Sequence, residues 1–328
     1  MGTHHEVSAS QLELWLESRL QTTELLMLST VANTGSKGLD DLIAYHFATK
    51  GARTRARLAL LSAQALALPD RTCVALAACC ELIHNASLLH DDIQDQDAER
   101  RGQIAAWRKF DVNTAMCGGT LLLSAAYRVL ANVPSYSAEL TMHVHQRTTD
   151  LIAGQVKDLD AVKQYPDMDA YLQITKGKSG SLLALPLELS LIAAREQSSL
   201  PMATAAAEAF AVAYQVIDDI KDHEADARGG HNNVIALLMR EGCDQAQALD
   251  RAAVLAQEHL VLASTSARWL PSKSGQVLVD LCLQLKCLAQ LPVGVEEQVV
   301  CTMLLWSVAG LVAWRQRCVR VPKAIASR

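Results

Sequence analysis

Apolar residues recur every three or four positions over long stretches of this chain, and this spacing constrains its fold more than any other feature. Two examples are "QLELWLESRLQTTELLML", residues 11–28, and "QVLVDLCLQLKCLAQL", residues 276–291. Such spacing places apolar side chains on one face of an α-helix. Most of the eight prolines fall where these stretches break, and no alternating run of polar and apolar residues predicts a strand. The sequence therefore predicts an all-α fold of roughly ten to twelve helices.

The chain shows no boundary between domains. No segment rich in Gly, Ser or Pro divides the helical stretches, and no short repeat is present. Of the 328 residues, 50% are hydrophobic and 20% are charged, which suits a large ordered core. We therefore expect one domain over residues 1–328, a single large helical bundle with several helices buried on all sides.

Charge, cysteine content and hydropathy exclude several classes of protein. The net charge of −5, without a basic block, argues against nucleic-acid binding. The nine cysteines are scattered without metal-finger spacing, so we expect reduced thiols, Cys79 and Cys80 in the core, and a cytoplasmic protein. The first ten residues lack the plan of a signal peptide. The most apolar run, Val299–Trp314, is shorter than the roughly 20 residues of a membrane span. We expect a buried C-terminal helix and no transmembrane segment, although the arginines that follow leave association with a membrane surface open.

Two acidic clusters end helical stretches that begin as apolar core. Residues 91–95 read "DDIQD" and residues 218–222 read "DDIKD". Residues four apart share a helix face, and like charges at that spacing destabilise a helix by a few tenths of a kcal/mol per pair. A divalent cation with oxygen ligands would offset the repulsion. Either cluster alone could be a solvated helix end, but the same spacing in both favours two carboxylate groups that face each other across a cavity.

Four motifs in order make the chain resemble the trans-isoprenyl diphosphate synthases, the polyprenyl synthetase family that includes farnesyl and geranylgeranyl diphosphate synthases. They are "HNASLLHDDIQDQDAERRG" at residues 84–102, "AGQVKDLD" at 153–160, "KSG" at 178–180 and "YQVIDDIKD" at 214–222. The resemblance covers about Gly51 to Asn233 and implies an isoprenoid-synthase bundle with a central cavity. It also implies a homodimer, which no feature of the sequence itself specifies.

The resemblance assigns roles to individual residues. The implied catalytic residues are Asp91, Asp92, Asp95, Lys178, Asp218 and Asp219. Metal ligands are implied at Asp91, Asp95, Asp218 and Asp222, which would hold about three Mg²⁺ ions with substrate bound. Residues implied to contact the allylic diphosphate are Arg100, Lys178, Ser179 and Gln215. Those implied to bind isopentenyl diphosphate are Arg53, Arg55, His84 and Arg101.

The sequence departs from the family's pattern at three places. The stretch "KGARTRARL", residues 50–58, stands where the family carries Gly-Gly-Lys-Arg-x-Arg-Pro, so that Ala52 replaces the lysine and Ala56 the proline. Gly119 replaces an aspartate. After the second acidic cluster, a short stretch with Arg228 as its cation replaces a longer loop with two lysines. Lys50 or Arg57 could restore the charge lost at Ala52.

The implied function is a trans-prenyltransferase that condenses an allylic prenyl diphosphate with isopentenyl diphosphate by Mg²⁺-assisted ionisation. Two alternatives are a class I terpene cyclase-like enzyme that uses one prenyl diphosphate, and a non-catalytic subunit of a heteromeric synthase. The retained Arg55, His84 and Arg101 favour the transferase over the cyclase. The two complete aspartate clusters argue against the subunit.

Ala86 and Ser87 are expected to set the length of the product. They lie five and four positions before Asp91, about 6 to 7.5 Å up the helix axis. Family members that make short products carry bulky aromatic residues there. Because both residues are small, we expect a product of 20 carbons or longer; close helix packing is the other explanation for their size.

Overall fold

The structure is a computed structural model that describes residues 9–49, 51–164, 166–229 and 232–289. In these residues it consists of thirteen α-helices, three short helices of other types (η) and one two-stranded ribbon. The elements are α1 (Ala9–Val31), α2 (Lys37–Ala48), α3 (Thr54–Ala65), α4 (Asp70–Gln94), β1 (Glu99–Arg100), β2 (Gln103–Ile104), α5 (Ala106–Lys109), α6 (Val112–Ala131), α7 (Ser137–Gln164), α8 (Met168–Thr175), the π-helix η1 (Lys176–Gly180), α9 (Ser181–Ala193), the 3₁₀ helix η2 (Gln197–Ser199), α10 (Leu200–Gly229), α11 (Val234–Arg240), α12 (Gln245–Arg268), the 3₁₀ helix η3 (Pro271–Lys273) and α13 (Gln276–Ala289).

The predicted all-α class is confirmed. The antiparallel ribbon of β1 and β2, which pairs Glu99 with Ile104, was not predicted. Its strands of two residues are too short to show an alternating pattern. The C-terminal helix expected at Val299–Trp314 lies outside the described residues.

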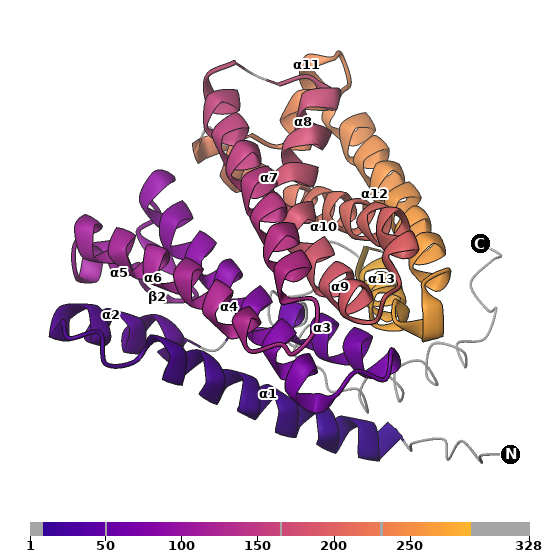
Figure 1. Ribbon diagram of the computed structural model, residues 1–328. Coiled ribbons are helices and arrows are strands. Elements are labelled where there is room, and N and C mark those ends of the chain that lie inside the picture. The colour runs from indigo at the N-terminus through magenta and orange to yellow at the C-terminus, as the bar shows by residue number, and fades with distance from the viewer. Residues whose placement is uncertain (1–8, 50, 165, 230–231, 290–328) are drawn as a thin grey trace, which may run out of the picture.

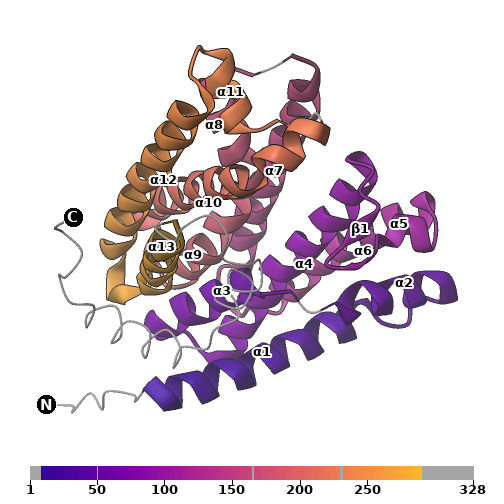
Figure 2. The same cartoon turned by 180° about the vertical axis from the view of Figure 1, so that it is seen from behind.

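The helices surround two hydrophobic core clusters. The first is built mainly from α1 to α7 and the second mainly from α8 to α13, and α9 contributes side chains to both. Figures 1 and 2 show α1 to α6 on one side of the molecule and α10, α12 and α13 on the other. The face of α9 near Leu185 and Leu189 packs in the first cluster, and that near Leu187 and Leu191 in the second. The cores therefore meet along this helix.

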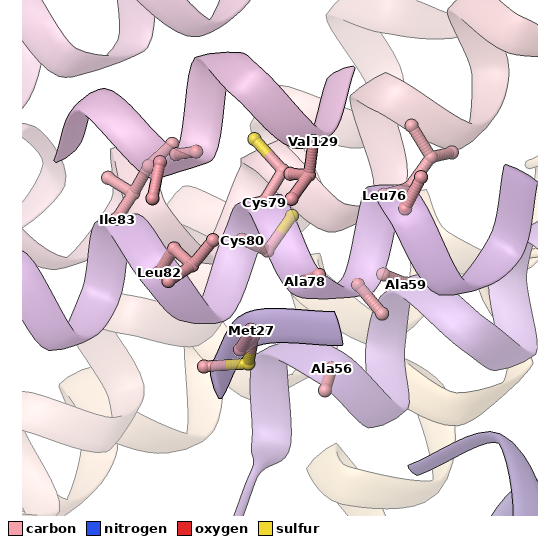
Figure 3. Packing of buried hydrophobic residues seen from close by; sticks show 14 of the residues in the cluster. Met27, Ala56, Ala59, Leu76, Ala78, Cys79, Cys80, Leu82, Ile83 and Val129 are labelled. Atoms are coloured by element: carbon pink, nitrogen blue, oxygen red, sulfur yellow. The ribbon is translucent and has the colours of Figure 1, made fainter. Parts of the chain in front are cut away.

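Helix α4 runs through the first core and ends at the first acidic cluster. Its middle is rich in small residues, which allow close approach of neighbouring helices, and Cys79 and Cys80 are buried there within the first core cluster (Figure 3). Both thiols are free, as predicted, and burial raises their pKa values well above the ordinary range. α4 is buried on nearly all sides up to Leu89, and the carboxylates of the first acidic cluster follow in its last turn.

Three described segments are long and apolar enough to cross a membrane, by length and composition alone. They are Asp70–Gln94, Val112–Ala131 and Gln197–Glu224. The absence of a transmembrane segment stays a prediction. In the structure 83% of the most apolar window of Asp70–Gln94 is buried, against 44% for Val112–Ala131 and 56% for Gln197–Glu224. Packing against other helices accounts for the apolar composition of Asp70–Gln94.

A buried ion pair connects α7, α9 and α10 away from the acidic clusters. The Glu188 side chain is fully buried, and its carboxylate accepts hydrogen bonds from Nε of Arg147 at 2.7 Å and from the hydroxyl of Thr204 at 2.5 Å. Nε2 of His143 lies 2.7 Å from the same carboxylate. These groups together compensate a charge that would otherwise be costly to bury.

The Arg147→Ala substitution should lower the free energy of unfolding by about 3 kcal/mol or more, because it leaves the Glu188 carboxylate buried with fewer donors. Urea denaturation of both proteins measures the difference. The Arg251→Ala variant serves as a control, since this arginine is exposed and pairs at 3.9 Å with Glu241. Equal unfolding midpoints for Arg147→Ala and the control would contradict the assignment.

Candidate active site

Both acidic clusters open onto one cavity of about 710 Å³. Asp91 and Asp95 reach it from the last turn of α4, and Asp218 and Asp222 reach it from α10. The two clusters therefore face the same space, as the sequence analysis expected. The other predicted residues that line this cavity are Arg100, Lys178, Ser179, Gln215 and Asp219.

Within the first cluster, Asp92 differs from its neighbours. Its side chain is 2% exposed and does not line the cavity. Nε of Arg100, in strand β1, donates to Oδ1 of Asp92 at 2.7 Å, and a second nitrogen of Arg100 donates to Asp97 at 3.0 Å. Asp92 thus anchors the short ribbon that holds Arg100 beside the cavity, while Asp91 and Asp95 keep their oxygens toward the open space.

Asp219 has a similar anchoring role in the second cluster, although unlike Asp92 it also lines the cavity. Only 3% of it is exposed. Its carboxylate accepts hydrogen bonds from the Tyr171 hydroxyl at 2.9 Å, from Nε2 of Gln215 at 2.7 Å and from the backbone N–H of Val234 at 2.7 Å. Asp219 therefore ties α8 and the start of α11 to α10, and Asp218 and Asp222 are the carboxylates of this cluster with oxygens available to a ligand.

Burial raises the pKa values of carboxylates in both clusters, because it disfavours their ionised form unless a cation is near. It raises the pKa of Asp91 to about 6; Lys178 opposes the shift and Asp95 adds to it. The pKa of Asp218 is raised by burial and by the charge of Asp222. Among the described residues no three His, Cys, Asp or Glu side chains converge on one point. The donors are nevertheless hard oxygen ligands in pairs, which fits Mg²⁺, an ion usually held by one or two carboxylates and substrate phosphates.

A π-helix places Lys178 in the cavity. Lys178 lies between Gly177 and Gly180 in η1, a single π-helical turn of the kind often found at functional sites. Nζ of Lys178 lies 2.8 Å from Oδ2 of Asp158 and 3.8 Å from Oδ2 of Asp95. Burial lowers the pKa of Lys178, but the facing carboxylates outweigh that effect and raise it, so this amine stays charged.

The residues at the larger cavity that were not given a role by the sequence analysis include Asp158, Tyr171 and Asn232. Asp158 lies in the quoted "AGQVKDLD" stretch, and its place four residues after Gly154 could have identified it. Tyr171 and Asn232 come from separate elements without acidic patterns, and only the fold brings them here.

The four residues matched to isopentenyl diphosphate line a second cavity of about 350 Å³. Arg53, Arg55, His84 and Arg101 all reach it. Nε of Arg55 and Nδ1 of His84 are buried there without a hydrogen-bond partner. Burial and the nearby arginines hold the pKa of His84 well below its usual value, so its ring is neutral. Buried polar groups normally find partners, and unpaired guanidinium and imidazole nitrogens fit an anionic ligand.

The two cavities adjoin along the same pair of helices. On α4, His84 lines the smaller cavity and Asp91 the larger one, seven residues or about 10 Å further along the helix. On α10, Tyr214 lines the smaller cavity and its neighbour Gln215 the larger. One space rich in carboxylates thus lies beside one rich in arginines.

The structure explains two departures from the family's pattern. The backbone N–H of Ala56 donates to Oε1 of the buried Glu81 at 2.9 Å, and a proline at this position would have no N–H to donate. At Gly119 a Cβ atom would lie 2.3 Å from Nε2 of His90, so the absence of a side chain makes room for that ring. Both replacements are compensated by a neighbouring side chain.

The charge lost at Ala52 is not restored by Arg57. Ala52 lines the smaller cavity. Arg57 does not, because its guanidinium donates to Oε1 of Glu17 at 2.8 Å. Lys50, the other candidate, and the structure around Gly230 lie outside the described residues, and the Arg228 side chain does too.

Ala86 and Ser87, the residues expected to set product length, line neither cavity. Ala86 is 3% exposed within the first core cluster, and the Ser87 hydroxyl donates to the His84 carbonyl oxygen at 2.8 Å. From this segment Leu88 reaches the larger cavity. The structure thus agrees with close helix packing at Ala86, and a role in product length remains a prediction.

Comparison with known proteins identifies the family. The family model described as polyprenyl synthetase matches residues 36–234. The chain belongs to the polyprenyl synthetase family. It is 33% identical over 181 residues to an all-trans-nonaprenyl-diphosphate synthase (geranyl-diphosphate specific) of Rhodobacter capsulatus, covering 54% of each chain. It is 32% identical over 201 residues to a farnesyl diphosphate synthase of Haemophilus influenzae, covering 57% of this chain and 67% of that one. The match thus spans about half to two thirds of these relatives' length.

Solved structures of the family share the fold. A geranylgeranyl pyrophosphate synthetase of Pyrococcus horikoshii superposes with a TM-score of 0.77 at 22% identity, covering 84% of this chain and 98% of the other. A polyprenyl synthase of Caulobacter crescentus, complexed with calcium and isoprenyl diphosphate, gives a TM-score of 0.73 at 19% identity and covers 86% and 99%. At this identity the likeness concerns the fold alone.

The Gly154→Ala substitution should destabilise this polyprenyl synthetase chain and displace Lys178. A Cβ at Gly154 would lie 2.5 Å from the backbone nitrogen of Lys178, where only a backbone shift can relieve the overlap. Gly38→Ala is the matched control, because a Cβ there meets nothing within 4 Å and the residue is helical. Thermal unfolding should show a loss for Gly154→Ala and no loss for Gly38→Ala. Equal unfolding temperatures for the two variants would contradict the close packing of α7 against η1 at Gly154.

Proposed function

We propose that this protein is a trans-prenyltransferase that condenses an allylic prenyl diphosphate with isopentenyl diphosphate. The observation that supports it most is the pair of adjoining cavities on α4 and α10, one lined by two carboxylate pairs and one by three arginines. A condensation of two diphosphates needs two anion sites whose reacting carbons can meet. The names of the relatives agree with this reaction.

The larger cavity would take the allylic substrate. Asp91, Asp95, Asp218 and Asp222 would hold Mg²⁺, which when bound supplies positive charge to a departing diphosphate. Lys178 and Arg100, which line the same cavity, would donate to the phosphate oxygens. Asp158, paired with Lys178, would orient its amine. As negative charge grows on the leaving oxygen, these fixed cations stabilise the transition state more than the ground state.

The smaller cavity would hold isopentenyl diphosphate through Arg55 and Arg101, with the neutral His84 as a hydrogen-bonding partner. The carbon–oxygen bond of the allylic diphosphate breaks, and the double bond of isopentenyl diphosphate attacks the allylic cation. Loss of a proton to the released diphosphate then completes the product. No protein nucleophile is required. We also propose a cytoplasmic location and a homodimer, in line with the resemblance.

Incubation of the full chain with Mg²⁺, radiolabelled isopentenyl diphosphate and geranyl or farnesyl diphosphate tests this function. Label should enter a longer prenyl diphosphate. A hydrocarbon or alcohol formed equally well without isopentenyl diphosphate would identify a cyclase-like enzyme instead. Absence of turnover with every allylic substrate would identify a non-catalytic subunit.

The Asp91→Ala substitution should lower kcat by two orders of magnitude or more, roughly the loss seen when one charge-stabilising group is removed. Asp160→Ala is the control, because Asp160 is an exposed carboxylate on α7 that does not line the cavity. Steady-state rates at saturating Mg²⁺ compare the two. A near-normal rate for Asp91→Ala would refute the metal-binding role of this cluster.

The product should have 20 carbons or more, since no bulky residue stands at positions 86 and 87. Replacing Ser87 by Phe should shorten the product, with chain length measured by chromatography of the dephosphorylated prenols. Ala86→Phe is a second test of the same prediction. Because Ala86 is buried, we expect this variant to be less stable than the unaltered protein. Unchanged product length in a folded, active Ser87→Phe variant would mean that the chain grows along another path.

A further inference from the structure

An ion pair inside the smaller cavity joins two residues from different helices. Glu24 of α1 pairs with the guanidinium of Arg53 at the start of α3, and both side chains line the cavity. Arg53 has a backbone φ of 52°, in the left-handed region that is uncommon for a residue other than glycine. The smaller cavity thus contains a carboxylate that forms an ion pair with one of the arginines lining it.

The charges of the described lining residues nearly balance. Arg53, Arg55 and Arg101 face Glu24 and Glu81, and His84 is neutral. Glu81 is fixed, because it is 7% exposed and accepts the backbone N–H of Ala56 at the start of α3. Glu24 is different: 39% of its side chain is exposed on the surface helix α1. It is therefore the carboxylate that can withdraw into solvent without breaking the core.

Because Ala52 carries no charge, the pairing of Glu24 with Arg53 strongly affects how many cations the smaller cavity offers to an anion. The cavity has a methyl group where the family's pattern carries a lysine, and Arg57 is paired with Glu17 outside the cavity. With Arg53 also paired, the cations left for an entering anion among the described lining residues are Arg55 and Arg101. A diphosphate in the cavity would gain a third cation by displacing Glu24.

We propose that Glu24 is a specificity-determining residue of the smaller cavity: it holds Arg53 until an anion of sufficient charge displaces it. This inference rests on the proposed function only in naming isopentenyl diphosphate as the natural anion. A monophosphate carries less negative charge than a diphosphate and competes less well with the carboxylate. The pair therefore raises the selectivity for diphosphates at some expense in affinity.

Binding of inorganic pyrophosphate to the full chain, measured by calorimetry with EDTA present, tests the proposal. Without metal, the larger cavity repels the probe through its carboxylates, so binding reports the smaller cavity. Glu24→Gln should tighten pyrophosphate binding by about 3- to 5-fold, the range for a partly exposed ion pair. The gain for inorganic phosphate should be larger, so that the preference for pyrophosphate falls.

Glu17→Gln is the matched control. It breaks a pair between the same two helices, Glu17 with Arg57, and neither residue lines the cavity. This variant should bind pyrophosphate as the unaltered protein does. If Glu17→Gln tightens binding equally, the effect comes from loosening α1 and the proposal fails.

A double-mutant cycle separates an effect through Arg53 from a general change in charge. In an Arg53→Ala background, Glu24→Gln should change the affinity by less than about 1.5-fold. Persistence of the full gain there, or no gain in the single variant, would overturn the proposal. In the condensation assay, Glu24→Gln should lower the Michaelis constant for isopentenyl diphosphate more than that for the allylic substrate.

Arg55→Ala distinguishes failure of this inference from failure of the proposed function. It should abolish binding of pyrophosphate without metal. Unimpaired binding in Arg55→Ala would show that the anion binds elsewhere, which would refute the assignment of the cavity itself rather than the effect of Glu24.

Discussion

Burial of carboxylates at the ends of two core helices is the constraint on which the rest of the site depends. Asp91 and Asp218 stand where α4 and α10 leave the core, and burial raises the pKa of each. Their charges are unfavourable without a cation. Asp92 and Asp219 reduce the problem by accepting hydrogen bonds from Arg100 and Tyr171, which positions the ribbon and α8 around the cavity. Each cluster thus divides into an anchoring carboxylate and carboxylates left free for a ligand.

Much of this could be predicted from the sequence, because the decisive signals are local. Helical spacing predicted the all-α class, and the repeated four-residue interval of the aspartates predicted that both clusters face one cavity. The sequence could not predict that Asp92 points away from the cavity or that the oxygens of Asp219 are taken up by hydrogen bonds, since their partners come from other elements. Nor could it show that Arg57 pairs with Glu17, 40 residues away, instead of replacing the charge lost at Ala52.

The two cavities differ in the charge of the side chains that line them, and this difference gives each a separate role in the proposed reaction. The larger one collects carboxylates and, in the proposed reaction, would require metal before it could accept a diphosphate. The smaller one offers arginines directly, with Glu24 as an internal competitor. An enzyme built this way can bind one substrate with metal and the other without it. The departures at Ala52 and Ala56 alter the second cavity and leave the carboxylate pairs of the first intact.

A crystal structure of the full chain with Mg²⁺, isopentenyl diphosphate and a non-reactive thio-analogue of the allylic diphosphate tests this account most directly. The account predicts metal density between the Asp91–Asp95 pair and Asp218, bridged by the analogue's phosphates. It also predicts the isopentenyl phosphates against Arg55 and Arg101 in the smaller cavity. Metal bound away from these carboxylates, or both diphosphates in one cavity, would contradict it.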